Sequence, residues 1–141
     1  MPVFQFLWEI SHASKPAVAA VSGVVVDIGT ALLLHCDLVY VADNAKFWMP
    51  FTQLGLCPEA ASSLLLPHLV GYQRAAEKLL LGETFYAAEA RDMGIVNRVM
   101  TVDELRPSLR SKRAALPAEI DHFDADGAGG EGGFHGVLRK A

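Results

Sequence analysis

One glutamate stands out among the residues that could do chemistry, because of the residues around it. Glu59 follows Pro58 and lies in a stretch of leucine, cysteine and alanine, LGLCPEAASS. A carboxylate in an apolar setting is expected to have a raised pKa, and such a group can act as a general base. Pro58 suits the first position of a helix. A glutamate in a first helical turn also complements the helix dipole, so this stretch alone leaves both interpretations open.

The stretch from Ser22 to Leu33 is a second candidate. A turn at Ser22-Gly23 leads through extended chain to a helix that we expect to begin near Ile28. The first backbone N–H groups of a helix have no intrahelical acceptor, so they can stabilise an oxyanion. An ordinary connection between a strand and a helix has the same pattern, and the spacing does not separate the two.

Other patterns carry less information. Gly127, Gly129 and Gly132 match G-x-G-x-x-G, but no strand precedes them and no helix follows, so a flexible linker is the better interpretation. The five histidines form no H-E-x-x-H motif, and we expect no metal site. A basic cluster is predicted to be a solvated helix face, with contact to an anionic ligand as the alternative; it comprises Arg106, Arg110, Lys112 and Arg113.

The composition narrows the class of protein. The 141 residues suffice for one domain with a core, and 52% are hydrophobic, which suggests an apolar surface covered by a partner subunit or a further segment. The net charge of −4 argues against nucleic-acid binding. The apolar runs fall short of the roughly 20 residues of a membrane span, and the first residues lack the basic region of a signal peptide. We therefore expect a cytoplasmic enzyme or binding domain.

Short apolar strands that alternate with helices predict an α/β fold. The predicted strands cover residues 17–21, 24–26, 38–42, 47–48 and 95–100, and the predicted helices cover 3–11, 28–36, 60–69, 72–81, 87–93 and 103–113. Residues 1–115 form the expected core domain. Residues 116–141 are polar and glycine-rich, and predict a mobile tail.

Three segments together resemble the enoyl-CoA hydratase/isomerase (crotonase) family. They are KPAVAAVSGVVVDIGTALLLHCDLVYVADNAKF, PFTQLGLCPEAASSLLLPHLVG and GYQRAAEKLLLGETFYAAEARDMGIVNRVM, and the match covers about residues 14–105. The resemblance implies the ββα superhelix of the ClpP/crotonase fold. That fold is expected to be partial here, because family members carry a substantial part before the lysine-proline pair. It also implies an acyl-CoA substrate, no metal or other cofactor, and a homo-oligomer, either trimer or hexamer.

The resemblance also bears on the reaction. Family hydratases use two glutamates, and the matching positions here hold Ala31 and Phe51. The isomerases use one glutamate in a P-F-x-x-L-G-x-x-x-E pattern, which Glu59 completes. By this resemblance Glu59 is the base, and the backbone N–H of Ile28 is one oxyanion donor. Asp27 departs from the family, which has glycine at that position.

Four further positions are expected to bind substrate, namely Gly29, Trp48, Phe51 and Leu54, with Trp48 and Phe51 lining the acyl pocket. The leading expected activity is the conversion of 3-enoyl-CoA to 2-enoyl-CoA in fatty-acid β-oxidation. The alternatives are hydration of 2-enoyl-CoA, and an inactive remnant with a binding or assembly role.

Overall fold

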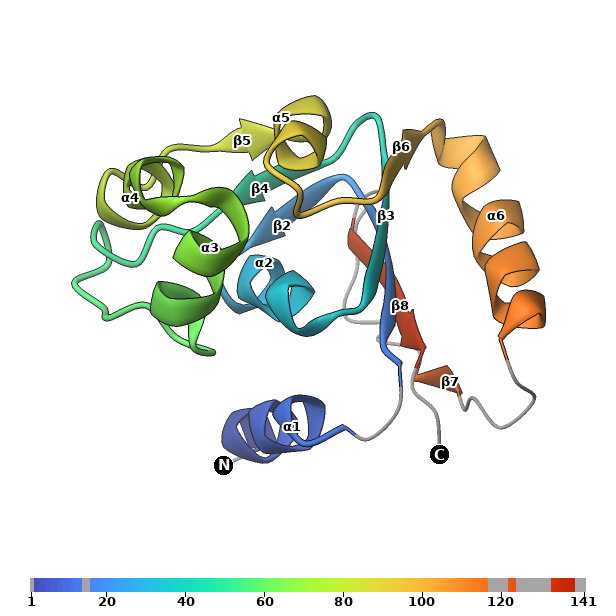
Figure 1. Ribbon diagram of the computed structural model, residues 1–141, viewed down its shortest axis with the longest axis horizontal. Coiled ribbons are helices and arrows are strands. Elements are labelled where there is room, and N and C mark those ends of the chain that lie inside the picture. Colours follow the sequence, from blue (N-terminus) through green and yellow to red (C-terminus); the bar gives the residue numbers. More distant parts are fainter. Residues whose placement is uncertain (1, 14–15, 117–121, 124–132, 139–141) are drawn as a thin grey trace.

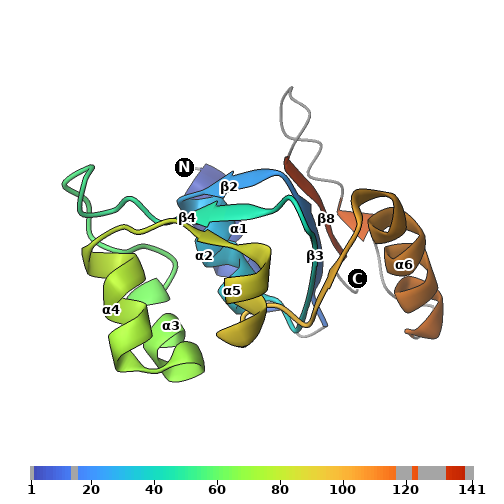
Figure 2. The same cartoon turned by 90° about the horizontal axis from the view of Figure 1, so that it is seen from above.

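The computed structural model describes residues 2–13, 16–116, 122–123 and 133–138 of the chain. A five-stranded sheet lies at the centre, with helices on both faces (Figures 1 and 2). Its strand order is β6 (Arg98–Met100), β3 (Leu38–Ala42), β1 (Val18–Ser22), β8 (Gly133–Leu138) and β7 (His122–Phe123). The first three strands are parallel, while β8 runs antiparallel to β1 and β7 antiparallel to β8.

A smaller sheet has the order β2 (Val24–Val26), β4 (Lys46–Trp48) and β5 (Phe85–Tyr86). Strand β2 follows β1 directly after Gly23, whose φ of 73° lets the chain bend there. The Gly23 carbonyl accepts the Lys46 N–H at 2.9 Å, and the Gly23 N–H donates to Asn44 Oδ1 at 3.0 Å. The bends that end β1 and β3 therefore lie side by side, and each strand continues into the smaller sheet.

Each of these strand pairs is followed by a helix. The first pair leads into α2 (Ile28–Leu32), which continues as the 3₁₀ helix η1 (Leu33–His35), and the second leads through a loop into α3 (Ser62–Val70). Two successive ββα units are thus present, as the predicted superhelix requires.

The central strands are buried on both faces. Side chains of β1 and β3 alternate between two apolar clusters because successive residues of a strand point to opposite faces. Val18, Ala20 and Tyr40 pack with Leu105 of α6 (Val102–Ala115), while their neighbours in the strands belong to the larger cluster. Figure 2 shows α6 on one face of the sheet, with α2 and α5 (Ala87–Asp92) on the other.

Most of the predicted elements are confirmed, including α1 (Pro2–Ser11) and α4 (Tyr72–Leu80). Two predicted boundaries need correction. The helix predicted over 60–69 begins at Ser62 and continues through Pro67 to Val70, and the strand predicted over 95–100 is only β6. The short strand β5 was not predicted, because two residues give no periodicity.

The predicted mobile tail over 116–141 is wrong for the residues of β7 and β8, which form an edge of the larger sheet. Strand β8 pairs with β1 with a register shift between Ala19 and Val21. Residues 117–121, 124–132 and 139–141 lie outside the described residues, as does the glycine pattern at 127–132. None of the described helices is long and apolar enough to cross a membrane.

Candidate active site

Glu59 lies in the loop between β4 and α3, and its side chain is exposed. It precedes α3 by three residues, so the prediction that it opens a helix is wrong. The apolar neighbours of Glu59 in the sequence do not enclose it here, because Leu54 and Leu56 are 59% and 46% exposed. Glu59 therefore offers an accessible carboxylate beside an uncovered apolar surface.

The backbone immediately after Glu59 is held in an unusual conformation. Ala60 and Ala61 have φ values of 53° and 54°, in the left-handed region that residues with a Cβ rarely adopt. The Glu59 carbonyl accepts two hydrogen bonds from Ser62, one from its N–H at 2.9 Å and one from its hydroxyl at 2.6 Å. His35 Nε2 donates to the Ala60 carbonyl at 2.7 Å. The end of η1 is thereby joined to the loop that carries Glu59.

Ile28 is the first residue of α2, as predicted. The backbone hydrogen bonds of this helix begin with the N–H groups of Thr30 and Ala31, which both donate to the Asp27 carbonyl at 3.0 Å. The first N–H groups of a helix have no intrahelical acceptor. The Thr30 hydroxyl donates to the Val25 carbonyl at 3.0 Å, which fixes α2 against the end of β2.

Asp27 sits immediately before this helix in a strained conformation, with φ 57° and ψ −121°. Its N–H donates to the Trp48 carbonyl at 2.8 Å, which ties the turn to β4. Its Oδ1 atom is buried and has no hydrogen-bond partner within the described part of the chain. A glycine would adopt this backbone without strain.

The four predicted substrate-binding residues have different environments. Phe51 is 0% exposed in the larger core cluster, so in the described part of the chain it offers no surface that a ligand could contact. Gly29 packs so closely that a Cβ there would lie 2.9 Å from Val25 Cγ1, which gives it a packing role. Leu54 is exposed and Trp48 half-buried, so both retain surface that a ligand could contact.

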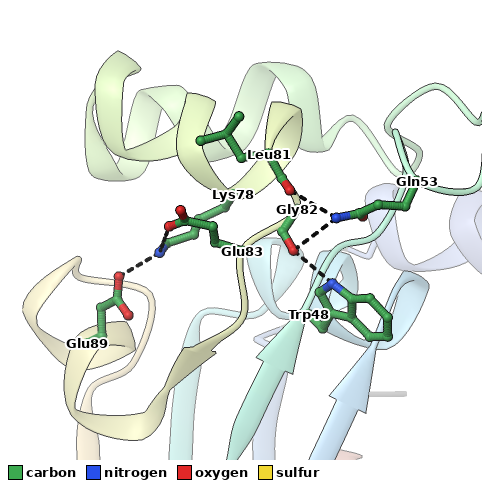
Figure 3. Close-up of polar contacts among 7 residues, drawn as sticks. All are labelled: Trp48, Gln53, Lys78, Leu81, Gly82, Glu83 and Glu89. Carbon is green, nitrogen blue, oxygen red and sulfur yellow. Dashed lines mark hydrogen bonds and ion pairs between the residues drawn. The ribbon is translucent and has the colours of Figure 1, made fainter.

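The start of the loop that leads to Glu59 is anchored on the C-terminal end of α4. The Trp48 indole N–H donates to the Gly82 carbonyl at 2.8 Å, the Thr52 hydroxyl to Leu80 at 2.9 Å, and Gln53 Nε2 to Leu81 at 2.9 Å. Figure 3 shows the Trp48 and Gln53 contacts converging on the turn after α4. The last carbonyls of a helix lack intrahelical donors, and these side chains supply them.

A buried lysine next to this turn was not singled out from the sequence. Lys78 Nζ lies 2.7 Å from Glu89 Oε1 and 3.8 Å from Glu83 Oε2 (Figure 3). It also lies 5.6 Å from the centre of the Phe85 ring. Its position on the apolar side of α4, beside Ala75 and Leu79, was the available signal. The cluster joins α4 to the first turn of α5.

The remaining candidates lie away from these residues. A cavity of about 720 Å³ is formed by α5, β6 and α6, with Arg91, Arg98 and Asp103 among its lining residues, and it contains none of the predicted site residues. Arg106, Arg110 and Lys112 are exposed, as expected of a solvated helix face. Among the described residues, no group of three or more His, Cys, Asp or Glu could hold a metal ion.

Fold and sequence agree in placing the chain in one family. Residues 1–124 match the enoyl-CoA hydratase/isomerase family. The solved structure of the enoyl-CoA hydratase/isomerase from Pseudoalteromonas atlantica T6c superposes with a TM-score of 0.76 and 45% identity, over 81% of this chain and 47% of that one. The ββα arrangement is therefore that of the crotonase fold, and the chain belongs to the enoyl-CoA hydratase/isomerase family.

Two curated relatives are named for different activities. The 4-chlorobenzoyl coenzyme A dehalogenase-1 of Arthrobacter sp is 40% identical over 114 residues, covering 81% of this chain and 41% of the relative. Enoyl-CoA delta isomerase 2 of Rattus norvegicus is 46% identical over 85 residues, covering 60% of this chain and 22% of the relative. The chain spans less than half the length of each of these proteins.

Proposed function

We propose that the chain acts as a Δ3,Δ2-enoyl-CoA isomerase, with Glu59 as the base. Glu59 takes the C2 proton of a 3-enoyl thioester and returns a proton to C4, so that the double bond moves and no water is consumed. The backbone N–H of Ile28 stabilises the enolate oxygen between the two steps. One carboxylate suffices, because the same group accepts and then donates the proton.

The observation that carries this proposal is the set of residues at the three carboxylate positions of the family. Ala31 and Phe51 occupy the two hydratase positions, have no ionisable group and are 0% exposed. Glu59 keeps its carboxylate and is exposed. Addition of water needs a second acid or base to place and deprotonate the water, and neither Ala31 nor Phe51 can provide one. The identity of 46% to enoyl-CoA delta isomerase 2 supports the same choice.

The test is isomerisation of a short 3-enoyl-CoA by the purified chain, followed by the absorbance of the conjugated 2-enoyl product. Glu59→Gln should reduce kcat by at least about 100-fold, the scale expected when a general base is removed. Glu83→Gln is the matched control, because Glu83 is also an exposed carboxylate but contacts Lys78. Full turnover by Glu59→Gln would remove Glu59 as the base.

Absence of turnover in the wild type would overturn the isomerase proposal and favour a binding or assembly role. The same samples are to be assayed with 2-enoyl-CoA as substrate. Addition of water to it would identify hydratase activity, the other activity named in the family. The wider proposal is that this reaction serves fatty-acid β-oxidation in the cytoplasm, uses no cofactor beyond the thioester substrate, and takes place in a trimer or hexamer.

A further inference from the structure

We propose that His35 is a positioning residue for Glu59 and acts through the hydrogen bond from its Nε2–H to the Ala60 carbonyl. The proposal rests on the proposed function, since it takes Glu59 as the base. The Nε2–O distance is 2.7 Å and spans 25 residues of sequence. His35 itself has no role in proton transfer in this scheme, because it contacts the backbone next to Glu59.

The strained backbone after Glu59 requires a contact with another part of the chain to hold it in place. Ala60 and Ala61 both have φ values near +54°, and a residue with a Cβ stays in that region only when its surroundings hold it there. The two bonds from Ser62 to the Glu59 carbonyl are local and stay intact if the whole segment shifts. Among the hydrogen bonds of the described residues, the His35 bond is the one that joins residues 59–61 to a distant part of the chain.

The geometry also fixes which partner donates. A backbone carbonyl can only accept, so the hydrogen must reside on Nε2 of His35. The neutral ring with its hydrogen on Nε2 and the doubly protonated ring both meet this requirement.

His35 connects the two parts of the proposed site. It ends η1, which continues α2 without interruption, and α2 begins at Ile28. One short helical stretch thus carries the proposed oxyanion donor at its start and the contact to the Glu59 loop at its end. The other end of the loop is fixed independently, because the side chains of Trp48, Thr52 and Gln53 donate hydrogen bonds to carbonyls at the C-terminal end of α4. Loss of the His35 bond should release the half of the loop that holds Glu59 and leave the first half in place.

Three substitutions of His35 separate the effect of the hydrogen bond from the effect of the size of the side chain. His35→Gln keeps an N–H donor at nearly the position of Nε2, His35→Asn places it too far from Ala60, and His35→Phe keeps a ring but has no donor. We expect kcat for 3-enoyl-CoA to fall by about 10-fold to 100-fold in the Phe and Asn variants, with KM nearly unchanged, because a displacement of about 1 Å has effects of this size. The Gln variant should recover most of the lost kcat.

Amide hydrogen exchange over residues 56–62 gives a readout that needs no activity. Exchange should accelerate about tenfold in His35→Phe and His35→Asn, and little in His35→Gln. Unchanged exchange in His35→Phe, or equal losses of kcat in all three variants, would overturn the role of His35. Should the wild type show no isomerase turnover, the proposed function fails, and exchange alone still decides whether His35 holds the loop.

Discussion

The Trp48 indole N–H donates to the Gly82 carbonyl at 2.8 Å, and this bond ties the end of β4 to the turn after α4. Gln53 Nε2 approaches the same carbonyl at 3.5 Å and donates to Leu81 at 2.9 Å. Gly82 has a φ of 63°, and a Cβ on it would overlap the amide of Gln53. The loop leading to Glu59 therefore docks on a turn whose backbone conformation and close contact with Gln53 favour glycine.

Replacement of Gly82 by alanine should destabilise the fold for two reasons. The left-handed backbone costs about 1 kcal/mol for a residue with a Cβ, and displacement of Gln53 costs about another 1 kcal/mol through its lost hydrogen bonds. Gly55→Ala is a matched control, since Gly55 has a φ of 67° and a Cβ added there would have nothing within 4 Å. Urea denaturation should show a larger loss of unfolding free energy for Gly82→Ala. Equal losses would show that Gln53 contributes nothing there.

Asp27 combines a strained backbone with a negative charge next to the proposed oxyanion donor. Asp27→Gly should raise the free energy of unfolding by about 1 kcal/mol, because it relieves strain and removes a buried oxygen without a partner, at some cost in chain entropy. It should also raise kcat, because a carboxylate beside Ile28 opposes an enolate. Asp27→Asn separates the two effects: it removes the charge and keeps the strain. A lower kcat in both variants would mean that the Asp27 carboxylate assists the reaction.

The stability of the fold should depend much more on the contact of Lys78 with Glu89 than on its contact with Glu83. The Lys78 side chain is 4% exposed, and its carboxylate partners are 45% exposed at 2.7 Å for Glu89 and 54% exposed at 3.8 Å for Glu83. Glu89→Gln leaves the buried ammonium poorly paired and should cost about 1–2 kcal/mol, less than a fully buried pair because solvent reaches the carboxylate. Glu83→Gln should cost at most about 0.5 kcal/mol. Thermal unfolding of both variants makes the comparison.

Lys78→Met gives a further check on the same cluster. It replaces the buried charge with an apolar chain of similar length, and such replacements are often neutral. A stability close to the wild type in Lys78→Met, with a clear loss in Glu89→Gln, would show that the unpaired charge causes the loss. A large loss in Lys78→Met would instead mean that the ion pair contributes net stability to the contact between α4 and α5.

The central strands and most helices could be predicted from the sequence because their signals are local. The apolar residues 38–42 are bounded by turn residues and form β3 with those limits. Strand β8 could not be predicted in the same way, because it forms by pairing with β1 more than 100 residues earlier in the chain. Gly133 and Gly136 also lower the intrinsic strand preference of that segment.

In the candidate site, too, the features that depend on local sequence could be predicted and those that depend on distant contacts could not. The start of α2 at Ile28 was predicted from a turn followed by a helical pattern, which is local information. The burial of Phe51 and the exposure of Glu59 depend on which distant elements cover them, and neither follows from the residues next to each in the sequence. The contact of His35 with Ala60 spans 25 residues and has no counterpart in any local pattern.

The two cysteines are expected to react very differently, because Cys57 is exposed and Cys36 is half-buried. The sequence around each cysteine is apolar, so the exposure of Cys57 does not follow from its neighbours in the chain. Burial, assisted by the negative charge of Asp37, raises the pKa of Cys36 to about 12. Alkylation requires the thiolate. At pH 8 iodoacetamide should therefore modify Cys57 in the folded chain, and Cys36 only after unfolding, as peptide mass spectrometry would show.

The same pKa shift predicts how stability depends on pH. Between pH 9 and 12 the unfolded chain loses the Cys36 proton and the folded chain retains it, since the ordinary pKa is 9.0 and the folded value about 12. The unfolded state binds fewer protons, so the free energy of unfolding should fall by up to about 1.4 kcal/mol per pH unit from this group. Cys36→Ala should show a shallower decline above pH 9 in urea denaturation, and Cys57→Ala should keep the wild-type slope. Identical slopes for Cys36→Ala and the wild type would show that the thiol ionises as easily in the folded chain as in the unfolded one.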